Sequence, residues 1–299
     1  MVVLERVQDW MLNKGMEGEI NKAGLTQQAV QLSFGGVYYL HRPASGGAQA
    51  EAVLMLHGAT ADSSAWIRFS GKLKSALALY IPDLPGHGNS VAGLTLSYTI
   101  SAQVERLIEL LGALKIAHVH IVASSMGAAI ALQLAARQPA LVTSLVLIGA
   151  VGVQAEPSWL QEHIASTGHN PMVEVRSKHD YVAMMRIGMA RPPTMPGFVL
   201  ASLARKYQAR LPVNLKIGHD IVTDLDQSAL LPQVVCPVLI IWGREDKVSH
   251  VSNAELLRNS LRAAQLHILD GLGHVPMVEA PRQVAALCDT FLTGLRGPA

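Results

Sequence analysis

A serine at the junction of a buried strand and a helix is the residue best placed in this sequence for nucleophilic chemistry. The stretch Ile121–Ala129 runs from apolar residues through Ser125 into a helical pattern that continues to Arg137. A tight strand–turn–helix unit lifts a serine hydroxyl above the edge of a sheet, in a strained backbone conformation with positive φ. We therefore predict that Ser125 attacks a carbonyl carbon; the simpler alternative is a plain helix N-cap.

The residues around Ser125 decide which of two adjacent serines is meant. The positions two before and two after the nucleophile must be small, because strand and helix pass close together there. Ser125 has Ala123 and Gly127 at these positions, so an alanine stands where a glycine is usual. Centring the motif on Ser124 would place valine and methionine there. Ser125 is therefore the predicted nucleophile.

A serine nucleophile needs a base, and the base needs an orienting acid. Asp246 follows the predicted strand Leu239–Trp242, and His274 lies in a glycine-rich loop after the predicted strand Leu266–Leu269. Because both follow strands, both should project at the same end of the sheet as Ser125. The chain order serine, aspartate, histidine predicts that His274 takes the Ser125 proton and that Asp246 fixes the histidine tautomer.

Other acidic and basic side chains near these motifs are the alternatives. Glu245 is the rival acid beside Asp246, and Asp270 is a more distant one because it ends the strand that leads to the histidine. Asp83 and His87 lie in a turn-rich loop after another strand, and we interpret both as structural.

The negative charge of a tetrahedral intermediate requires two backbone N–H donors. Met126, directly after the nucleophile, should supply one of them at the start of its helix. The loop after the predicted strand Val53–Leu56 should supply the other, and Ala59 is the candidate by position. His57 in the same loop is interpreted as structural.

Short β-rich runs alternate with helical patterns along the chain, which indicates an α/β fold with a mostly parallel, eight-stranded sheet flanked by helices. An opening hairpin is predicted around Gly35-Gly36. The predicted strands are Val30–Phe34, Val37–His41, Val53–Leu56, Leu79–Ile81, Val119–Val122, Leu145–Ile148, Val238–Trp242 and Leu266–Leu269. The predicted helices between them are Ile100–Leu114, Met126–Arg137, Ser252–Leu261 and Gln283–Leu295.

The alternation stops in the middle of the chain, where only helical pieces separated by prolines remain. We predict an inserted helical cap over residues 152–226, a hydrolase-type core over 26–151 and 227–299, and an N-terminal helical segment over 1–25. An insertion between two strands of one sheet would cover the carboxyl ends of the strands, where it would cap a ligand crevice.

The cap is rich in flexible apolar side chains, which suit a cavity that accepts acyl chains of variable length. The alternative for any single residue is that it only packs the cap onto the core. Three residues beside the loop motifs are further pocket candidates. The pocket candidates are Trp66, Met172, Met185, Met189, Met195, Phe198, Val248 and Val275.

The composition narrows the classes of partner. A net charge of +2 without a basic run disfavours a nucleic-acid partner. The 50% hydrophobic and only 15% charged residues favour a large core and an apolar site. The sequence contains no phosphate-binding glycine loop, dinucleotide fingerprint or zinc-type spacing, so we expect no cofactor and no metal. Cys236 and Cys288 are interpreted as small buried residues.

The N-terminus has no basic region followed by a long apolar run, which disfavours a signal peptide. We expect a cytoplasmic protein. Apolar residues from Val3 to Met11 recur at helical spacing, and we expect them to pack on their own domain. A contact with the inner face of a membrane, through this helix and the cap, is the alternative.

Together these motifs resemble the α/β-hydrolase superfamily, and within it the bacterial family V lipases and the abhydrolase-domain monoacylglycerol lipases. The resemblance covers about Gln28 to Leu292 and includes the cap segment from Asn170 to Gly197. It implies a serine carboxylesterase acting on monoacylglycerols or esters of short-to-medium acyl chains. The family usually has a bulky aromatic residue where Ala59 stands, so a wider site near the carbonyl is implied.

Two other functions are alternatives to ester hydrolysis. Hydrolysis of a carbon–carbon bond in vinylogous diketones also uses a Ser-Met-Gly elbow, and cationic cap residues such as Arg186 and Arg191 facing the pocket would favour it. A ligand-binding member of the fold without activity would carry a broken triad. Dehalogenases and epoxide hydrolases are disfavoured because they have an aspartate in place of Ser125.

Overall fold

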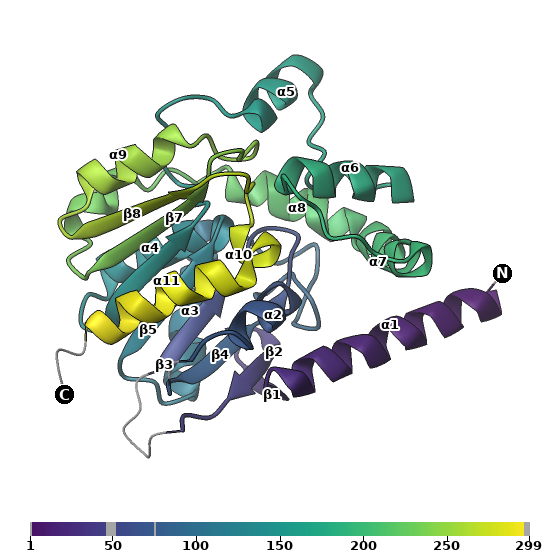
Figure 1. The fold of residues 1–299 in the computed structure, drawn as a ribbon, viewed down its shortest axis with the longest axis horizontal. Helices are drawn as coiled ribbons and strands as arrows, with labels where there is room; N and C mark the ends of the chain where they lie inside the picture. The colour runs from purple at the N-terminus through teal and green to yellow at the C-terminus, as the bar shows by residue number, and fades with distance from the viewer. Residues whose placement is uncertain (1, 46–51, 75, 296–299) are drawn as a thin grey trace.

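An eight-stranded sheet forms the centre of the molecule (Figure 1). The computed structural model of the protein describes residues 2–45, 52–74 and 76–295. The strand order is β1-β2-β4-β3-β5-β6-β7-β8; the β1–β2 and β2–β4 pairs are antiparallel and the others are parallel. The strands are β1 (Thr26–Leu32), β2 (Gly35–Arg42), β3 (Ala52–Leu56), β4 (Ala78–Pro82), β5 (Val119–Ser124), β6 (Val142–Ile148), β7 (Val238–Gly243) and β8 (Ala264–Leu269).

Helices cover both faces of this sheet, so its central strands are buried on both sides. Residues alternate between two cores along each strand: Leu54 packs toward α3, α4 and α9, and Val53 packs toward α2 and α11. The helices of the two layers are α2 (Ile67–Ser70), which follows a short 3₁₀ turn η1 (Ser63–Trp66), α3 (Ile100–Ala113), α4 (Met126–Arg137), α9 (Ser252–Ser260), α10 (Pro276–Glu279) and α11 (Pro281–Gly294). The predicted α/β-hydrolase fold is confirmed.

The order of the strands reverses at β3, and this switch point places the site. From β3 the chain moves outward to β4, then crosses back to β5 on the other side of β3. The carboxyl ends of β3 and β5 are direct neighbours, with Leu56 opposite Ala123. Ligand crevices of open α/β sheets form at such a switch point.

The opening hairpin forms as predicted, but its turn lies two residues earlier than expected. Leu32 pairs with Gly35, so Ser33 and Phe34 make the turn and Gly35 already belongs to β2. A Cβ built on Gly35 would lie 2.7 Å from the Val91 side chain, and the φ of Gly35 is +133°. This glycine is needed for the close approach of a neighbouring loop rather than for the turn itself.

Residues 149–237, all of which the structure describes, form helices and no strand. The elements of this segment are α5 (Trp159–Thr167), α6 (Lys178–Gly188), α7 (Gly197–Ala209), α8 (Leu211–Ile221) and a 3₁₀ helix η2 (Ser228–Gln233). The helices α5 to α8 gather at one end of the sheet (Figure 1). At the neck of this insertion, the Gln227 N–H donates to the Gly152 carbonyl at 2.7 Å, which holds the two chain passages together.

Polar contacts fasten the inserted helices to the core. Asp224 accepts hydrogen bonds from the Ile100 and Ser101 amides, both at 2.8 Å, and so caps the N-terminus of α3 from outside the helix. The Arg210 guanidinium donates to the carbonyls of Gly86 and Gly88. These contacts fix the α7–α8 side of the insertion.

The N-terminal helix α1 (Val2–Lys22) projects from the β1 edge of the sheet toward α7 (Figure 1). Its polar side contacts the protein: Arg205 of α7 donates to the Asp9 carboxylate at 2.6 Å and to the Gln8 side chain at 3.3 Å. Buried Leu12 and Ile20 lie on the same side of the helix. Of the helices within the described residues, none has the length and apolarity that crossing a lipid bilayer requires.

The expectation that the apolar residues of α1 pack on their own domain is wrong. A helix has 3.6 residues per turn, so the apolar residues fall roughly opposite Asp9 and Leu12. Trp10 is 61% exposed and Val3 is 76% exposed. We call this exposed set the α1 stripe; it consists of Val3, Leu4, Val7, Trp10 and Met11.

Two helical glycines should respond in opposite directions to an added methyl group. A Cβ on Gly127 would lie 2.6 Å from the Leu56 carbonyl oxygen, whereas a Cβ on Gly112 in α3 meets nothing within 4 Å. We expect Gly127→Ala to lower the free energy of unfolding by about 1–3 kcal/mol through overpacking. Gly112→Ala should raise it by about 0.5–1 kcal/mol. Urea titrations of both variants test this, and equal effects would contradict the close approach of α4 and β3.

Candidate active site

Ser125 occupies the sharp turn between β5 and α4. Its φ is 55° and its ψ is −121°, a combination that a non-glycine residue adopts only under strain. The turn is held by two hydrogen bonds, from the Ser125 amide to the Ile148 carbonyl at 3.1 Å and from the Ala128 amide to the Ser125 carbonyl at 2.9 Å. Ser125 is partly exposed, so its hydroxyl remains open to a ligand.

The two small neighbours and the competing serine fall into distinct environments. Ala123 is fully buried in the core, so the strand accommodates its methyl group where a glycine is usual. Gly127 passes the β3 carbonyls too closely for any side chain. Ser124 is also fully buried, and its hydroxyl has no partner among the described residues. Of the two adjacent serines, Ser125 is thus accessible and Ser124 is not.

His274 and Asp246 form a buried hydrogen-bonded pair. His274 Nδ1 lies 2.8 Å from Asp246 Oδ2, and the two side chains are 4% and 0% exposed. The second carboxylate oxygen, Oδ1, accepts the Val248 amide at 2.8 Å and the Ser249 amide at 2.9 Å. With the acid fully satisfied, His274 donates from Nδ1, and its Nε2 is the nitrogen left to accept a proton.

The rival acids do not reach the histidine. Glu245 is exposed, and its amide donates to the Leu272 carbonyl at 3.0 Å. Asp270 is exposed and forms an ion pair with Arg244. Neither carboxylate contacts His274, whereas Asp246 does.

Gly149, directly after β6, connects the serine turn to the histidine pair, and the sequence reasoning missed it. A Cβ there would lie 2.5 Å from the His274 carbonyl oxygen, 3.2 Å from His274 Nδ1 and 3.4 Å from Asp246 Oδ2. Its φ is +52°, and the preceding Ile148 carbonyl accepts the Ser125 amide. Only glycine leaves room for the pair at this point. The available signal was a glycine at the carboxyl end of a predicted central strand.

The predicted donor amides for an oxyanion come from the adjoining ends of β3 and β5. A Cβ on Gly58 would lie 2.9 Å from Ser125 Cβ and 3.5 Å from its Oγ, so the β3 loop runs beside the serine. Within the part of the chain that the structure describes, neither the Ala59 amide nor the Met126 amide donates a hydrogen bond. Both N–H groups are therefore free to bind a negatively charged oxygen next to Ser125.

His57 and His87 form a buried support beneath this loop. His57 Nε2 accepts the Leu84 amide at 3.0 Å, while its Nδ1 lies 2.8 Å from the Gly58 carbonyl. The two rings meet edge to face with centroids 4.8 Å apart. Burial lowers the pKa of both histidines, so both are neutral at pH 7.

Asp83 has a similar structural environment in the loop after β4. Its carboxylate accepts the Ser63 and Asn89 amides, both at 2.8 Å. Burial raises the pKa of Asp83, and the two amide hydrogen bonds oppose that shift. Because both oxygens are engaged by backbone groups, this carboxylate holds the loop in shape.

The predicted pocket residues fall into two groups. Four of the methionines gather around Tyr181 and Tyr207 in a separate apolar cluster of the cap. The Met172 carbonyl accepts the Thr60 hydroxyl at 3.3 Å, and the Met189 Cα lies 3.0 Å from a Cβ built on Gly273, so this cluster adjoins the oxyanion and histidine loops. The four methionines are Met172, Met185, Met189 and Met195.

The remaining pocket candidates are more dispersed. Trp66 is fully buried and packs edge to face on Phe69, with centroids 5.3 Å apart, in the core between α2, α11 and the sheet. Val248 and Val275 are half-buried beside Asp246 and His274, and Phe198 is half-buried on α7. The structure brings the two valines to the pair and keeps Trp66 in the core.

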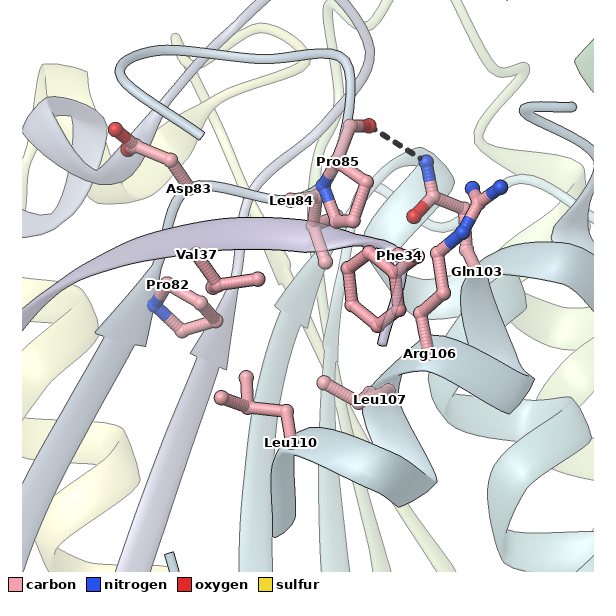
Figure 2. A pocket seen from close by; sticks show the side chains of 10 residues that line it. All are labelled: Phe34, Val37, Pro82, Asp83, Leu84, Pro85, Gln103, Arg106, Leu107 and Leu110. Atoms are coloured by element: carbon pink, nitrogen blue, oxygen red, sulfur yellow. Dashed lines mark hydrogen bonds between the residues drawn. The ribbon is translucent and has the colours of Figure 1, made fainter. Parts of the chain in front are cut away.

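A pocket between β2, α3 and the loop after β4 contains none of the predicted site residues. Its lining combines apolar side chains with those of Asp83, Gln103 and Arg106 (Figure 2). Its polar contact is the hydrogen bond from Gln103 Nε2 to the Pro85 carbonyl at 2.9 Å. We assign no chemistry to this pocket because it holds no nucleophile.

Comparisons with known proteins bear on the same features. Residues 53–287 match the model of a family described as the alpha/beta hydrolase family. Lipase 3 of Moraxella sp. (strain TA144) is 32% identical over 249 residues, which cover 82% of this chain and 78% of that protein. Monoacylglycerol lipase abhd6-B of Xenopus laevis is 29% identical over 290 residues, covering 92% and 85%.

A solved structure is also similar over nearly the whole chain. It is described as the crystal structure of a membrane phospholipase A, a novel bacterial virulence factor. The TM-score is 0.94 and the identity is 32%, with 99% of this chain and 94% of that chain covered.

The hydrogen bond between Asp246 and His274 predicts unequal effects of two neighbouring substitutions. Asp246→Asn should lower kcat for a p-nitrophenyl ester by about 100-fold or more, because the amide removes the charge that stabilises the imidazolium and the tautomer. Glu245→Gln should change kcat by about twofold at most. Steady-state kinetics of both variants check this, and the reverse order would exclude Asp246 as the orienting acid.

Proposed function

We propose that this chain, which belongs to the alpha/beta hydrolase family, is a lipid ester hydrolase whose catalytic residues are Ser125, His274 and Asp246. The chain is a serine hydrolase of carboxylic esters. The observation that carries the assignment of residues is the buried His274–Asp246 hydrogen bond, which Gly149 links to the strained Ser125 turn.

In the first half of the reaction, Ser125 Oγ attacks the ester carbonyl carbon while His274 Nε2 accepts the hydroxyl proton. The carbonyl oxygen becomes negatively charged and accepts hydrogen bonds from the Ala59 and Met126 amides. Asp246, fixed by two backbone amides, stabilises the imidazolium. Collapse of the tetrahedral intermediate breaks the ester C–O bond, and His274 gives its proton to the departing alcohol.

In the second half, water hydrolyses the acyl group on Ser125. His274 accepts a proton from the water as its oxygen attacks the acyl carbon, and the same two amides bind the new oxyanion. His274 then returns that proton to Ser125 Oγ as the carboxylic acid leaves. The enzyme regains its starting protonation state.

Two features of the site support monoacylglycerols or esters of short-to-medium acyl chains as substrates. The methionine cluster next to the site consists of unbranched side chains that adapt to acyl chains of different length. Ala59 leaves space beside the carbonyl that a bulky residue would fill. Arg186 and Arg191, the two cap cations named for the carbon–carbon bond substrates, are both exposed, so neither favours those substrates with their carboxylate ends.

The proposed nucleophile has a matched control one residue away. Ser125→Ala should lower hydrolysis of p-nitrophenyl esters by at least about 1,000-fold across acyl chains from two to sixteen carbons. Ser124→Ala, which removes a buried hydroxyl, should retain kcat within about threefold. The wild type should favour the short-to-medium chains. Substantial turnover by Ser125→Ala would contradict the mechanism, and a preference for the longest chains would contradict the substrate class.

The α1 stripe supports a peripheral contact with a lipid surface. Because Arg205 and neighbouring residues of α7 bind the polar side of α1, the apolar side faces away from the protein. Arg6 lies close to the stripe, where it can meet lipid phosphates, and Lys14 nearby is paired with Glu17 at 2.6 Å. An enzyme with water-insoluble esters as substrates must meet such a surface.

Vesicle binding tests this contact. The triple substitution Leu4→Ser, Val7→Ser and Trp10→Ser should weaken co-sedimentation with phosphatidylglycerol-containing vesicles by at least about tenfold. Each substitution removes more than about 1 kcal/mol of the free energy gained when an apolar side chain is buried in the membrane interface. Hydrolysis of soluble p-nitrophenyl butyrate should stay within about twofold of wild type. Vesicle binding that survives the three substitutions would contradict the proposed contact.

A matched control uses exposed apolar residues outside α1. Leu94, Val222 and Val235 are 59%, 68% and 50% exposed and lie on separate loops. Replacing these three residues with serine should leave vesicle binding unchanged. An equal loss of binding in this control would indicate that general surface hydrophobicity is responsible.

A further inference from the structure

The carboxylate of Glu279, at the end of α10, joins the histidine loop to the inserted cap. Its Oε1 accepts the Gly273 amide at 2.7 Å, and Gly273 directly precedes His274. Its Oε2 accepts the Arg191 amide at 2.7 Å. One side chain therefore binds two backbone N–H groups that come from two distant parts of the chain.

The two joined segments also touch directly. The His274 amide donates to the Gly188 carbonyl at 2.9 Å, so the last residue of α6 is bonded to the backbone of the proposed base. A Cβ on Gly273 would lie 2.8 Å from the Ala190 nitrogen and 3.0 Å from the Gly188 carbonyl oxygen. The segment 188–191 thus lies against the histidine loop, with the Glu279 carboxylate bridging the two.

Chemistry favours an ionised carboxylate at this bridge. Two carboxylate oxygens can accept about four hydrogen bonds, whereas a glutamine would present an NH₂ group toward backbone donors. Burial raises the pKa of Glu279 above its usual value, and the amide hydrogen bonds and the Arg191 charge oppose that shift. Such charge-assisted bonds are stronger than neutral ones, so they can fix a loop precisely.

We propose that Glu279 is a positioning residue, which sets the place of His274 by tying the Gly273 amide to the Arg191 backbone of the cap. This inference rests on the proposed role of His274 as the base. Since a misplacement of about 1 Å in catalytic geometry can cost about 100-fold in rate, a tether one residue from the base has leverage over kcat. The same tether makes the end of α6, with Met189 and Met185, part of the framework around the histidine.

The alternative is that Glu279 only holds the cap down. Asp224 provides the matched control for that alternative, because its carboxylate also joins the inserted segment to the core through two backbone amides. Asp224 caps α3 and contacts no part of the histidine loop. A general loosening of the cap should therefore affect both variants alike.

Kinetics of Glu279→Gln and Asp224→Asn on p-nitrophenyl butyrate distinguish a positioning role of Glu279 from a role in holding the cap alone. We expect Glu279→Gln to lower kcat by about 10- to 100-fold with KM within about threefold of wild type. Asp224→Asn should keep kcat within about threefold of wild type, although both variants should have a lower melting temperature than wild type. Glu279→Asp, which keeps the charge but shortens its reach, should have an intermediate kcat and covers the case in which the glutamine variant does not fold.

The pH dependence of the rate ratio gives a second readout. The carboxylate form is the one that accepts the amides, so protonation through the raised pKa should remove the tether as the pH falls. The ratio of wild-type to Glu279→Gln rates should therefore be largest at neutral pH and shrink toward acid pH. Arg191 is the charged side chain that faces this carboxylate, and its charge opposes the upward shift of the Glu279 pKa.

Proton NMR reports on the hydrogen bond of His274 without any turnover. The buried His274 Nδ1–H hydrogen-bonded to Asp246 should give a downfield proton resonance, which should broaden or exchange faster in Glu279→Gln than in Asp224→Asn. If the wild type hydrolyses no ester, the proposed function fails and this measurement still decides the role of Glu279. A Glu279→Gln enzyme with wild-type kcat, an equal loss in Asp224→Asn, or an unchanged proton signal would each overturn the proposal.

Discussion

The hydrogen bond between His274 and Asp246 is the contact on which the arrangement of the site depends. It joins two loops that follow neighbouring strands, and it is formed in nearly complete exclusion from water. A buried carboxylate is costly unless every oxygen has a partner, and the amides of Val248 and Ser249 supply the remaining ones. The absence of a side chain at Gly149 then provides the space that the pair occupies.

The sheet positions the reacting groups, and the cap supplies the apolar surface beside them. The parallel strands bring the Ser125 turn, the β3 loop and the histidine pair to one end, where the order of β3, β5, β6, β7 and β8 fixes their sequence across the sheet. The cap adds apolar methionine surface from above and is anchored by polar contacts at widely separated places. Stiff loops next to an adaptable apolar cluster suit an enzyme whose reacting group is constant and whose substrate tail varies.

Much of this arrangement could be predicted from the sequence because it follows from local patterns. The apolar strands, the small residues around Ser125 and the order of the strand-end motifs each point to one fold. Contacts that depend on close approach between distant segments were not predictable in this way. The glycine at 149 and the bridge made by Glu279 arise only when β6, β8 and the cap meet, and Gly35 is needed because the loop at Val91 passes close to it.

The orientation of α1 does not follow from the sequence for a related reason. Periodicity identified an apolar side but not what lies against it, and the default is that the apolar side faces the protein. Here Arg205 of α7 binds the polar side of α1 through Gln8 and Asp9, which leaves the apolar side facing outward.

The neck of the insertion has a consequence for how this fold can change over time. The backbone hydrogen bond between Gly152 and Gln227 closes the inserted segment where it leaves and rejoins the core. The insertion is therefore connected to the sheet, along the chain, through two adjacent ends. Closing a loop costs free energy that grows only slowly with its length, so segments of other lengths could be exchanged above this neck without disturbing the register of β6 and β7. Changes of length that spare the 188–191 segment beside the histidine loop could in this way alter the substrate range while the reacting groups stay in place.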